Sequence, residues 1–350
     1  MNPADAPARW TRRQLLAAGA AAPIVGLIPA ARAAASPPAT LVVSDDSCRW
    51  HTPPEWHQEQ ADRLDAVLTA IAPLAEAGRI RRQDGRPATE ADLRLVHTGS
   101  YLNVVRRDIA EGSGELSTGD TRLSARSYEA SAAAAGCGIV AVDAVLAGRT
   151  RNAFCAVRPP GHHASAQRGM GFGIFNTIAI AARHAQRRHG VARILIIDWD
   201  VHHGNGTQAT FWTDGGVLFF DTHQHPWYPG TGMAGETGEG PGAGLIVNRP
   251  LPEGSGRTEV LSLYRESLVP AADRFRPELV LISAGFDSRL GDPLGRFTLV
   301  EPDFAEMTRI VLDIADRHAG GRCVSILEGG YNLEGLGSAA AAHVTELARA

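Results

Sequence analysis

The sequence predicts a single α/β domain in which helices flank a parallel β-sheet. Apolar runs rich in β-branched residues alternate with stretches of helical periodicity up to the C-terminus. Five of these runs end in polar or titratable side chains, and ligands bind at the carboxyl ends of strands in open parallel sheets. We therefore expect one active-site rim, formed by the ends of the runs that begin at Phe154, Ile194, Val217, Leu279 and Cys323.

Strands and helices alternate over residues 36–350 without an internal repeat or linker, which predicts one domain. Short strands are expected at 41–43 and 95–97. Glycine and proline crowd residues 226–244, which predicts a long loop. Helical periodicity, closed in several cases by glycine, predicts helices at 61–76, 127–146, 174–189, 258–274 and 303–318.

Residues 1–35 have the order of an export signal. The pair Arg12-Arg13 precedes an uncharged apolar stretch, and Ala31-Arg32-Ala33 follows it. Paired arginines indicate the bacterial twin-arginine pathway, and therefore a periplasmic or secreted protein. An ordinary basic start to a helix is the alternative. The apolar stretch is short for a membrane span, so we expect no stable span after the signal is removed.

Composition argues against capture of nucleic acid. The 350 residues carry 34 basic and 38 acidic side chains, a net charge of −4, and no basic block follows the N-terminus. A hydrophobic content of 44% suits a compact α/β protein. The four cysteines, Cys48, Cys137, Cys155 and Cys323, have no C-x-x-C spacing. Cys155 and Cys323 lie in apolar runs and Cys137 in an alanine-rich helix, so buried free thiols rather than disulfides are expected.

The strand predicted at 194–197 ends in two acids and two histidines. If the chain stays extended, its period of two places Asp198, Asp200 and His202 on one side. A catalytic metal takes about three protein ligands and leaves one position open. Asp200 and His202 supply two ligands, and Asp287 is the best-placed third. Two carboxylates and one imidazole favour a divalent ion such as zinc, without excluding iron(II), cobalt or manganese.

A second histidine pair supplies a base. His162 and His163 follow a rigid Pro-Pro-Gly turn, and an imidazole can accept a proton near neutral pH. Asp198 and Asn205 are candidates to hold the second ring nitrogens. Tyr331, after two glycines, can donate a hydrogen bond to a developing oxyanion. The alternatives are surface histidines and a buried structural tyrosine.

These motifs together resemble the zinc-dependent histone deacetylase and acetylpolyamine amidohydrolase superfamily, and most closely its class II-like bacterial members. The resemblance covers residues 41 to 345, in one order. Its motifs are R-P-P-G-H-H at 158–163, D-x-D-x-H-H-G-x-G at 198–206, G-F-D at 285–287, G-D-P at 291–293 and E-G-G-Y at 328–331.

The resemblance implies the arginase/deacetylase fold, an eight-stranded parallel sheet between helices, with one zinc ion. It makes Asp200, His202 and Asp287 the zinc ligands. His163 resembles the general base and acid, His162 its electrostatic neighbour, and Tyr331 the oxyanion donor.

The same resemblance implies a substrate channel. Phe172 and Tyr228 resemble the aromatic pair that walls the acyl-lysine chain, and their alternative is ordinary loop packing. Leu294 resembles an apolar rim residue, and Asp120 resembles an acid that holds the substrate backbone. A potassium ion is also implied, near Asp198, Asp200, His202 and Asp221.

Two departures from the family pattern bear on these expectations. The segment His57–Arg63 lacks the prolines of the usual H-P-E-x-P-x-R, which affects the substrate rim. Asp221 stands where the family usually has serine, which affects the potassium site. Neither departure touches the expected zinc ligands.

The sequence therefore favours a metal-dependent amidohydrolase that hydrolyses linear N-acyl amides. A non-catalytic binding module would be expected to lack a ligand, the base or Tyr331, and none is lost. An arginase-like reaction would need a D-x-H-x-D pattern, and the glycines at 169–173 lack the context of a nucleotide loop. Acetyl-lysine peptides, acetylated polyamines, other small amides and esters remain open as substrates, and the oligomeric state is not indicated.

Overall fold

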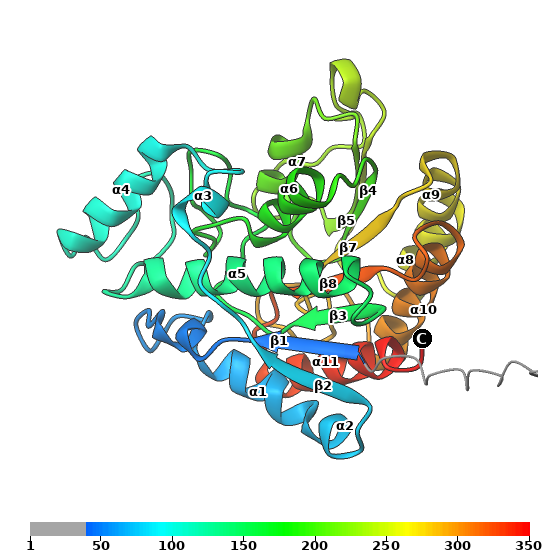
Figure 1. Cartoon of the computed structure of the whole chain (residues 1–350), viewed down its shortest axis with the longest axis horizontal. Helices are drawn as coiled ribbons and strands as arrows, with labels where there is room; N and C mark the ends of the chain where they lie inside the picture. The colour runs from blue at the N-terminus through cyan, green and yellow to red at the C-terminus, as the bar shows by residue number, and fades with distance from the viewer. Residues whose placement is uncertain (1–39) are drawn as a thin grey trace, which may run out of the picture. The chain divides into compact units, whose positions relative to one another are not determined.

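The computed structural model describes residues 40–350, so the export segment expected at 1–35 lies outside the described residues. The described chain contains one sheet of eight strands, all of them parallel (Figure 1). This confirms the predicted fold class. The strands are β1 (Thr40–Ser44), β2 (Ile80–Asp84), β3 (Asn152–Cys155), β4 (Ile194–Asp198), β5 (Val217–Gln224), β6 (Ile246–Leu251), β7 (Leu279–Ala284) and β8 (Cys323–Leu327).

The helices fall between the strands, as parallel connections require. The α-helices are α1 (Asp62–Ala70), α2 (Ala72–Glu76), α3 (Glu90–Leu93), α4 (Gly99–Ala110), α5 (Ser127–Leu146), α6 (Thr177–His189), α7 (Asn205–Phe211), α8 (Arg257–Leu263), α9 (Val269–Phe275), α10 (Glu301–His318) and α11 (Leu333–Leu347). Two 3₁₀ turns, η1 (Asp46–Trp50) and η2 (Gly240–Gly242), and one π-helical turn, η3 (Tyr264–Leu268), complete them.

The strand order is β2-β1-β3-β8-β7-β4-β5-β6. The chain passes from β3 to β4, and β7 and β8 later fill the space between these two strands. In open α/β sheets a ligand binds outside the carboxyl ends of the strands, at such a change in order. The topology thus directs attention to the ends of β3, β8, β7 and β4.

Two helical layers cover the sheet. On one face α5 packs on β1, β3 and β8, α6 packs on β7, and α7 packs on β5. On the other face α11 packs on β3 and α10 on β7, while α1 packs against α11. Figure 1 shows α5 and α11 on opposite sides of β3. The central strands are buried on both faces, which explains their continuous apolar sequences.

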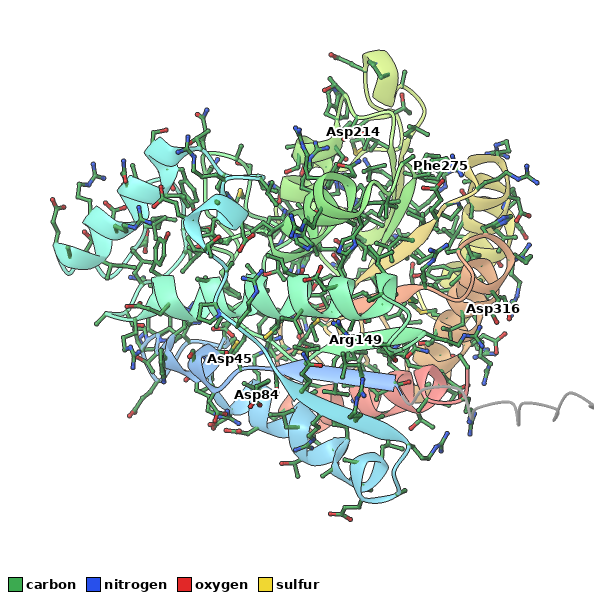
Figure 2. All side chains as sticks on the ribbon, viewed as in Figure 1. Asp45, Asp84, Arg149, Asp214, Phe275 and Asp316 are labelled. Atoms are coloured by element: carbon green, nitrogen blue, oxygen red, sulfur yellow. The ribbon has the colours of Figure 1, made fainter. Side chains whose placement is uncertain are left out.

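Side chains fill the space between the sheet and its helices (Figure 2). The four cysteines are buried free thiols, as predicted. Within the described residues one helix, α5, has the length and hydropathy of a membrane span, and 78% of that segment is buried inside the protein. Its alanines and glycines let it lie close to the sheet and to α6, which is the pattern of a core helix.

Three expectations about secondary structure were wrong. Residues 95–97 are not a strand: they form a turn between α3 and α4. The helix expected at 61–76 is divided into α1 and α2 at Ile71, and the helix expected at 258–274 contains the π-helical turn η3. Two edge strands, β2 and β6, were not anticipated. In Figure 2 the labelled Asp84 marks the carboxyl end of β2, beside Asp45, which follows β1.

Candidate active site

Three side chains that could hold a metal ion meet at the ends of β4 and β7. Asp200 and His202 follow β4, and Asp287 follows the neighbouring strand β7. The Nδ1 atom of His202 lies 2.9 Å from Asp200 Oδ1 and 3.1 Å from Asp287 Oδ2. All three residues are buried, and one ligand atom from each lies within 4.8 Å of the other two.

Backbone hydrogen bonds fix the orientation of both carboxylates. Asp200 Oδ2 accepts a hydrogen bond from the N–H of Gly329 at 2.8 Å, and Asp287 Oδ1 accepts one from Val201 at 2.8 Å. A Cβ atom at Gly329 would collide with Asp287 Oδ2 and Asp200 Oδ2, so only glycine lets β8 approach this closely. Three strand ends therefore build the cluster together.

The chain does not stay extended after Asp198, contrary to the expected alternation of side chains. β4 ends at Asp198, and Asp198 Oδ1 accepts a hydrogen bond from the N–H of Asp200 at 3.1 Å. The turn that follows separates the two carboxylates. Asp198 faces the histidine pair, whereas Asp200 and His202 face Asp287.

The cluster has more negative charge than its protein surroundings neutralise. Burial, followed by the charge of Asp200, raises the pKa of Asp287 to about 7. Burial opposes the charged form of His202, but hydrogen bonds to Asp200 and Asp287 outweigh it and raise the pKa of His202 to about 10. Two adjacent buried carboxylates and one imidazole thus favour a bound cation at this position.

The histidine pair lies beside the cluster with its ring nitrogens held from behind. His162 Nδ1 is 2.9 Å from Asp198 Oδ2, and His163 Nδ1 is 2.8 Å from Asn205 Oδ1. The two imidazole rings are 4.1 Å apart between centroids. A carboxylate behind one ring and an amide oxygen behind the other give the two histidines different charges.

The pKa values of the two histidines move in opposite directions. Burial favours the neutral form of His162, but the charges of Asp198 and Asp200 outweigh it and raise its pKa well above the ordinary value. Burial, and then the charges of His162 and His202, lower the pKa of His163 well below the ordinary value. Near neutral pH, His163 is therefore uncharged and able to accept a proton.

The loop after β8 brings Tyr331 to the same site. Arg63, from α1, donates to the carbonyl of Gly330 at 2.6 Å and lies over the Tyr331 ring, 4.7 Å from its centroid. Asp292 accepts a hydrogen bond from the N–H of Tyr331 at 2.7 Å. Burial raises the pKa of Tyr331 well above the ordinary value, although the charge of Arg63 acts in the other direction. The phenol is therefore a hydrogen-bond donor at neutral pH.

A cavity of about 300 Å³ opens above these groups. It brings together every residue that the sequence assigned to substrate binding, and it also reaches the base, one metal-ligand candidate and the phenol. Trp227 and Gly171 line it as well and were not anticipated. The lining residues are Asp120, His163, Gly171, Phe172, His202, Trp227, Tyr228, Leu294 and Tyr331.

Asp120 fixes the mouth of this cavity. Its Oδ1 accepts a hydrogen bond from the N–H of Gly171 at 2.8 Å, and its Oδ2 accepts one from the Tyr228 hydroxyl at 2.9 Å. The Tyr228 ring stands edge-on to His163, with centroids 5.1 Å apart. A Cβ atom at Gly171 would collide with the His163 ring, and Phe172 has a left-handed φ of 66°. Such strain persists only where the surrounding structure holds it.

A buried ionic network beneath the site was not assigned a role from sequence. Glu59 lies 2.6 Å from Arg158 and 3.1 Å from Arg63, and all three side chains are fully buried. Arg158 opens the R-P-P-G-H-H motif, so the network joins the histidine loop to the Tyr331 loop. The sequence did carry a signal for this network. The His57–Arg63 segment departs from the family pattern but keeps its glutamate, Glu59, and its arginine, Arg63.

The two departures from the family pattern, the His57–Arg63 segment and Asp221, lie close to the site. The His57 ring contacts the Phe172 ring, with centroids 4.6 Å apart, so this segment reaches the cavity wall. Asp221 pairs in register with Asp198 on the neighbouring strand. Its Oδ2 accepts a hydrogen bond from Gly204 at 2.8 Å, and its Oδ1 is 2.7 Å from His223 Nδ1.

A parallel eight-stranded sheet with a carboxylate–imidazole cluster, a histidine pair and a phenol at its carboxyl edge defines the metal-dependent deacetylase class. The histone deacetylase domain model matches residues 57–347. The chain belongs to the histone deacetylase family, within the superfamily that includes the acetylpolyamine amidohydrolases.

Relatives come from several kingdoms. The chain is 40% identical to histone deacetylase 10, chloroplastic, of Oryza sativa subsp. japonica, over 82% of this chain and 68% of the relative. It is 38% identical to a histone deacetylase-like amidohydrolase of Pseudomonas aeruginosa, over 84% and 82%. It is 40% identical to human polyamine deacetylase HDAC10, over 81% of this chain but only 43% of that protein. The crystal structure of the HDA15 HD domain superposes with a TM-score of 0.83 at 36% identity, covering 89% of this chain and 88% of that one.

Proposed function

We propose that this protein is a zinc-dependent deacetylase that hydrolyses N-acetyl or other N-acyl amides of lysine-like or polyamine-like amines. The observation that carries the proposal is that one cavity is lined by the uncharged buried His163, the candidate metal ligand His202 and the buried phenol of Tyr331. Membership of the deacetylase family supports hydrolysis of an acyl amide.

The donor set fits zinc. Asp200, His202 and Asp287 would hold the ion through two carboxylate oxygens and one imidazole nitrogen, which are ligands that zinc accepts. The imidazole nitrogen already lies 2.9 and 3.1 Å from the two carboxylate oxygens, so these residues would hold such an ion with little rearrangement. When bound, zinc supplies a Lewis acid and lowers the pKa of a water molecule.

The protein's own residues then account for the proton transfers. His163 accepts a proton from the attacking water as the new C–O bond forms at the acyl carbon. Tyr331 donates a hydrogen bond to the oxygen that becomes negatively charged. As the C–N bond breaks, His163 returns the proton to the leaving amine, so acetate and a free amine are the products. Asp198 and Asn205 orient the two imidazoles throughout.

The cavity wall suits an extended aliphatic chain. Phe172, Tyr228 and Leu294 supply apolar surface along it. Asp120 is the one carboxylate among the described residues that line it, and its two oxygens hold the N–H of Gly171 and the hydroxyl of Tyr228. The described lining offers no further carboxylate to pair with the second ammonium of a polyamine. We therefore favour an acyl-lysine side chain over an acetylpolyamine, although two relatives are named polyamine deacetylases.

The test uses the purified, zinc-replete protein and compares its rate of hydrolysis of an acetyl-lysine peptide with its rate on N-acetylputrescine. Faster cleavage of the peptide supports this preference, and faster cleavage of the polyamine contradicts it. Hydrolysis of an ester but of neither amide would favour the esterase alternative. Specific binding of the peptide without turnover, by protein that holds zinc, would favour a non-catalytic binding module.

Two further assignments belong to the same proposal. The first is a potassium ion bound near Asp198, Asp200, His202 and Asp221. Thermal stability tests it, and should be higher in potassium salts than in tetramethylammonium salts. Residues 36–350 form the catalytic domain, and export by the twin-arginine pathway delivers it to the periplasm or medium. Cell fractionation of the wild type and of an Arg12→Lys, Arg13→Lys variant tests export, because the variant should stay in the cytoplasm.

A further inference from the structure

A second group of side chains that could hold a metal ion lies at the opposite edge of the sheet from the active site. Asp143 is near the C-terminal end of α5, and His184 and His189 are on the last turns of α6. Both helices run back from the carboxyl edge of the sheet, so these ends lie near the amino ends of β3 and β4. Nothing in the proposed reaction uses them.

The three side chains converge on one oxygen atom. Asp143 Oδ1 lies 2.7 Å from His184 Nε2 and 2.7 Å from His189 Nε2. The two imidazole rings stand edge to face, with centroids 5.6 Å apart and an interplanar angle of 69°. One ligand atom from each residue lies within 4.8 Å of the others, as in the cluster at the active site.

We propose that Asp143, His184 and His189 bind a transition-metal ion, with zinc as the probe, which ties α5 to α6. Two imidazoles and one carboxylate select zinc, copper or nickel rather than calcium or magnesium, which prefer oxygen ligands. Such a three-ligand set leaves a further coordination position for water.

The surroundings provide that open position. A surface hollow of about 470 Å³ borders Asp143 and His184. The arginines at 86, 187 and 188 also line it and oppose a cation, but Arg86 is paired with Asp92 at 3.1 Å. His189 is the last residue of α6, and the partial negative charge of a helix C-terminus favours a cation there.

Metal binding competes with the two hydrogen bonds. Each histidine must present an unprotonated Nε2, so its proton moves to Nδ1 or is released. The nitrogen–oxygen separations must widen by roughly 0.6 Å to reach those of a tetrahedral zinc site. The side chains of Asp143 and His189 are 35% and 27% exposed, so both have room to rotate.

The experiment counts zinc ions per chain by equilibrium dialysis and elemental analysis over a series of free zinc concentrations. The wild type should bind two, the tighter at the active site. Asp143→Asn and the more exposed His189→Gln should each bind one and keep wild-type peptide turnover. Asp200→Asn should lose the tighter ion and retain the weaker, and Asp143→Asn added to it should abolish zinc binding.

His318→Gln is the matched control. His318 Nε2 also lies 2.7 Å from a carboxylate, that of Asp273, but the second partner of that carboxylate is Arg317 rather than a histidine. This variant should keep both zinc ions. The proposal is wrong if the wild type binds one ion, or if the weaker ion persists in Asp143→Asn. Failure of the proposed function would instead appear as absent turnover, whatever the number of ions.

Discussion

Glu328 Oε2 accepts a hydrogen bond from the N–H of Gly161 at 2.6 Å, and the same oxygen accepts one from the N–H of His162 at 3.1 Å. The carboxylate is fully buried at the end of β8, three residues before Tyr331. It therefore connects the loop that holds the base to the loop that holds the oxyanion donor.

Replacing Glu328 with leucine should lower kcat for deacetylation by about 10²-fold, because a displacement of about 1 Å costs that much in a positioned site. Glu328→Gln should recover most of the rate, since its amide oxygen can accept both hydrogen bonds. Zinc content should be unchanged in both variants, as measured by elemental analysis. Equal rates in the leucine and glutamine variants would show that these hydrogen bonds do not position the histidine loop.

Tyr331→Phe tests the oxyanion donor. Removing one such donor costs about 10²–10³-fold in kcat. The Phe172 ring, 5.7 Å away between centroids, and Arg63 above the ring should keep the phenylalanine in place, so KM and zinc content should change little. Steady-state kinetics on an acetyl-lysine peptide provides the measurement. A variant with wild-type kcat would remove Tyr331 from the mechanism.

Replacing a charged residue of the buried ionic network should lower stability more than replacing one in an exposed ion pair. Arg158→Met leaves Glu59 buried beside fewer cations, which should cost about 3–5 kcal/mol in the free energy of unfolding. Arg49→Gln breaks a pair with Asp65 in which the side chains are 32% and 53% exposed, and should cost less than about 1 kcal/mol. Denaturant titrations compare the two. Similar losses would mean that the buried network contributes no more than a surface pair.

His97 should make the fold sensitive to acid. Burial lowers its pKa to about 4, and its Nε2 accepts a hydrogen bond from the N–H of Asn176 at 2.9 Å. The ordinary pKa of a histidine is about 6.5, so between pH 6.5 and pH 4 the unfolded chain binds a proton at His97 that the folded chain does not bind. The stabilisation from uncharged His97 is therefore fully present above pH 6.5. As the pH falls towards 4 it is lost, which lowers the free energy of unfolding by up to about 3 kcal/mol.

The difference between the wild type and His97→Gln isolates this effect from other titrating groups. The two proteins should converge in unfolding free energy between pH 7 and pH 4.5. A difference that stays constant with pH would show that His97 does not resist protonation in the folded state.

The central strands and the main site residues were predictable because each depends on local sequence. Apolar runs such as Ile194–Ile197 are buried on both faces, and the polar residues just after them must lie at the sheet edge. Edge strands carry less signal. β2 reads Ile-Arg-Arg-Gln-Asp with four exposed residues, and β6 contains Pro250.

Contacts between distant segments could not be predicted from local patterns. Arg158 meets Glu59 across 99 residues, and Arg63 meets Gly330 across 267. The turn after Asp198 was also missed. Asp198 and Asp200 accept local backbone hydrogen bonds within it, but the N–H of Val201 donates to Asp287, which follows another strand. Trp227 reaches the cavity through a long loop, where it donates to the carbonyl of Leu294 at 2.8 Å. Such positions depend on the assembled fold.

Zinc-dependent turnover is the most direct test of the proposed function. The apoprotein, prepared with a chelator, should not hydrolyse an acetyl-lysine peptide, and one zinc ion per active site should restore turnover. Asp287→Asn, which removes a proposed ligand charge and keeps the size of the side chain, should bind zinc weakly at this site and remain inactive after the same addition. Turnover by metal-free protein, or by Asp287→Asn at the wild-type rate, would contradict the account.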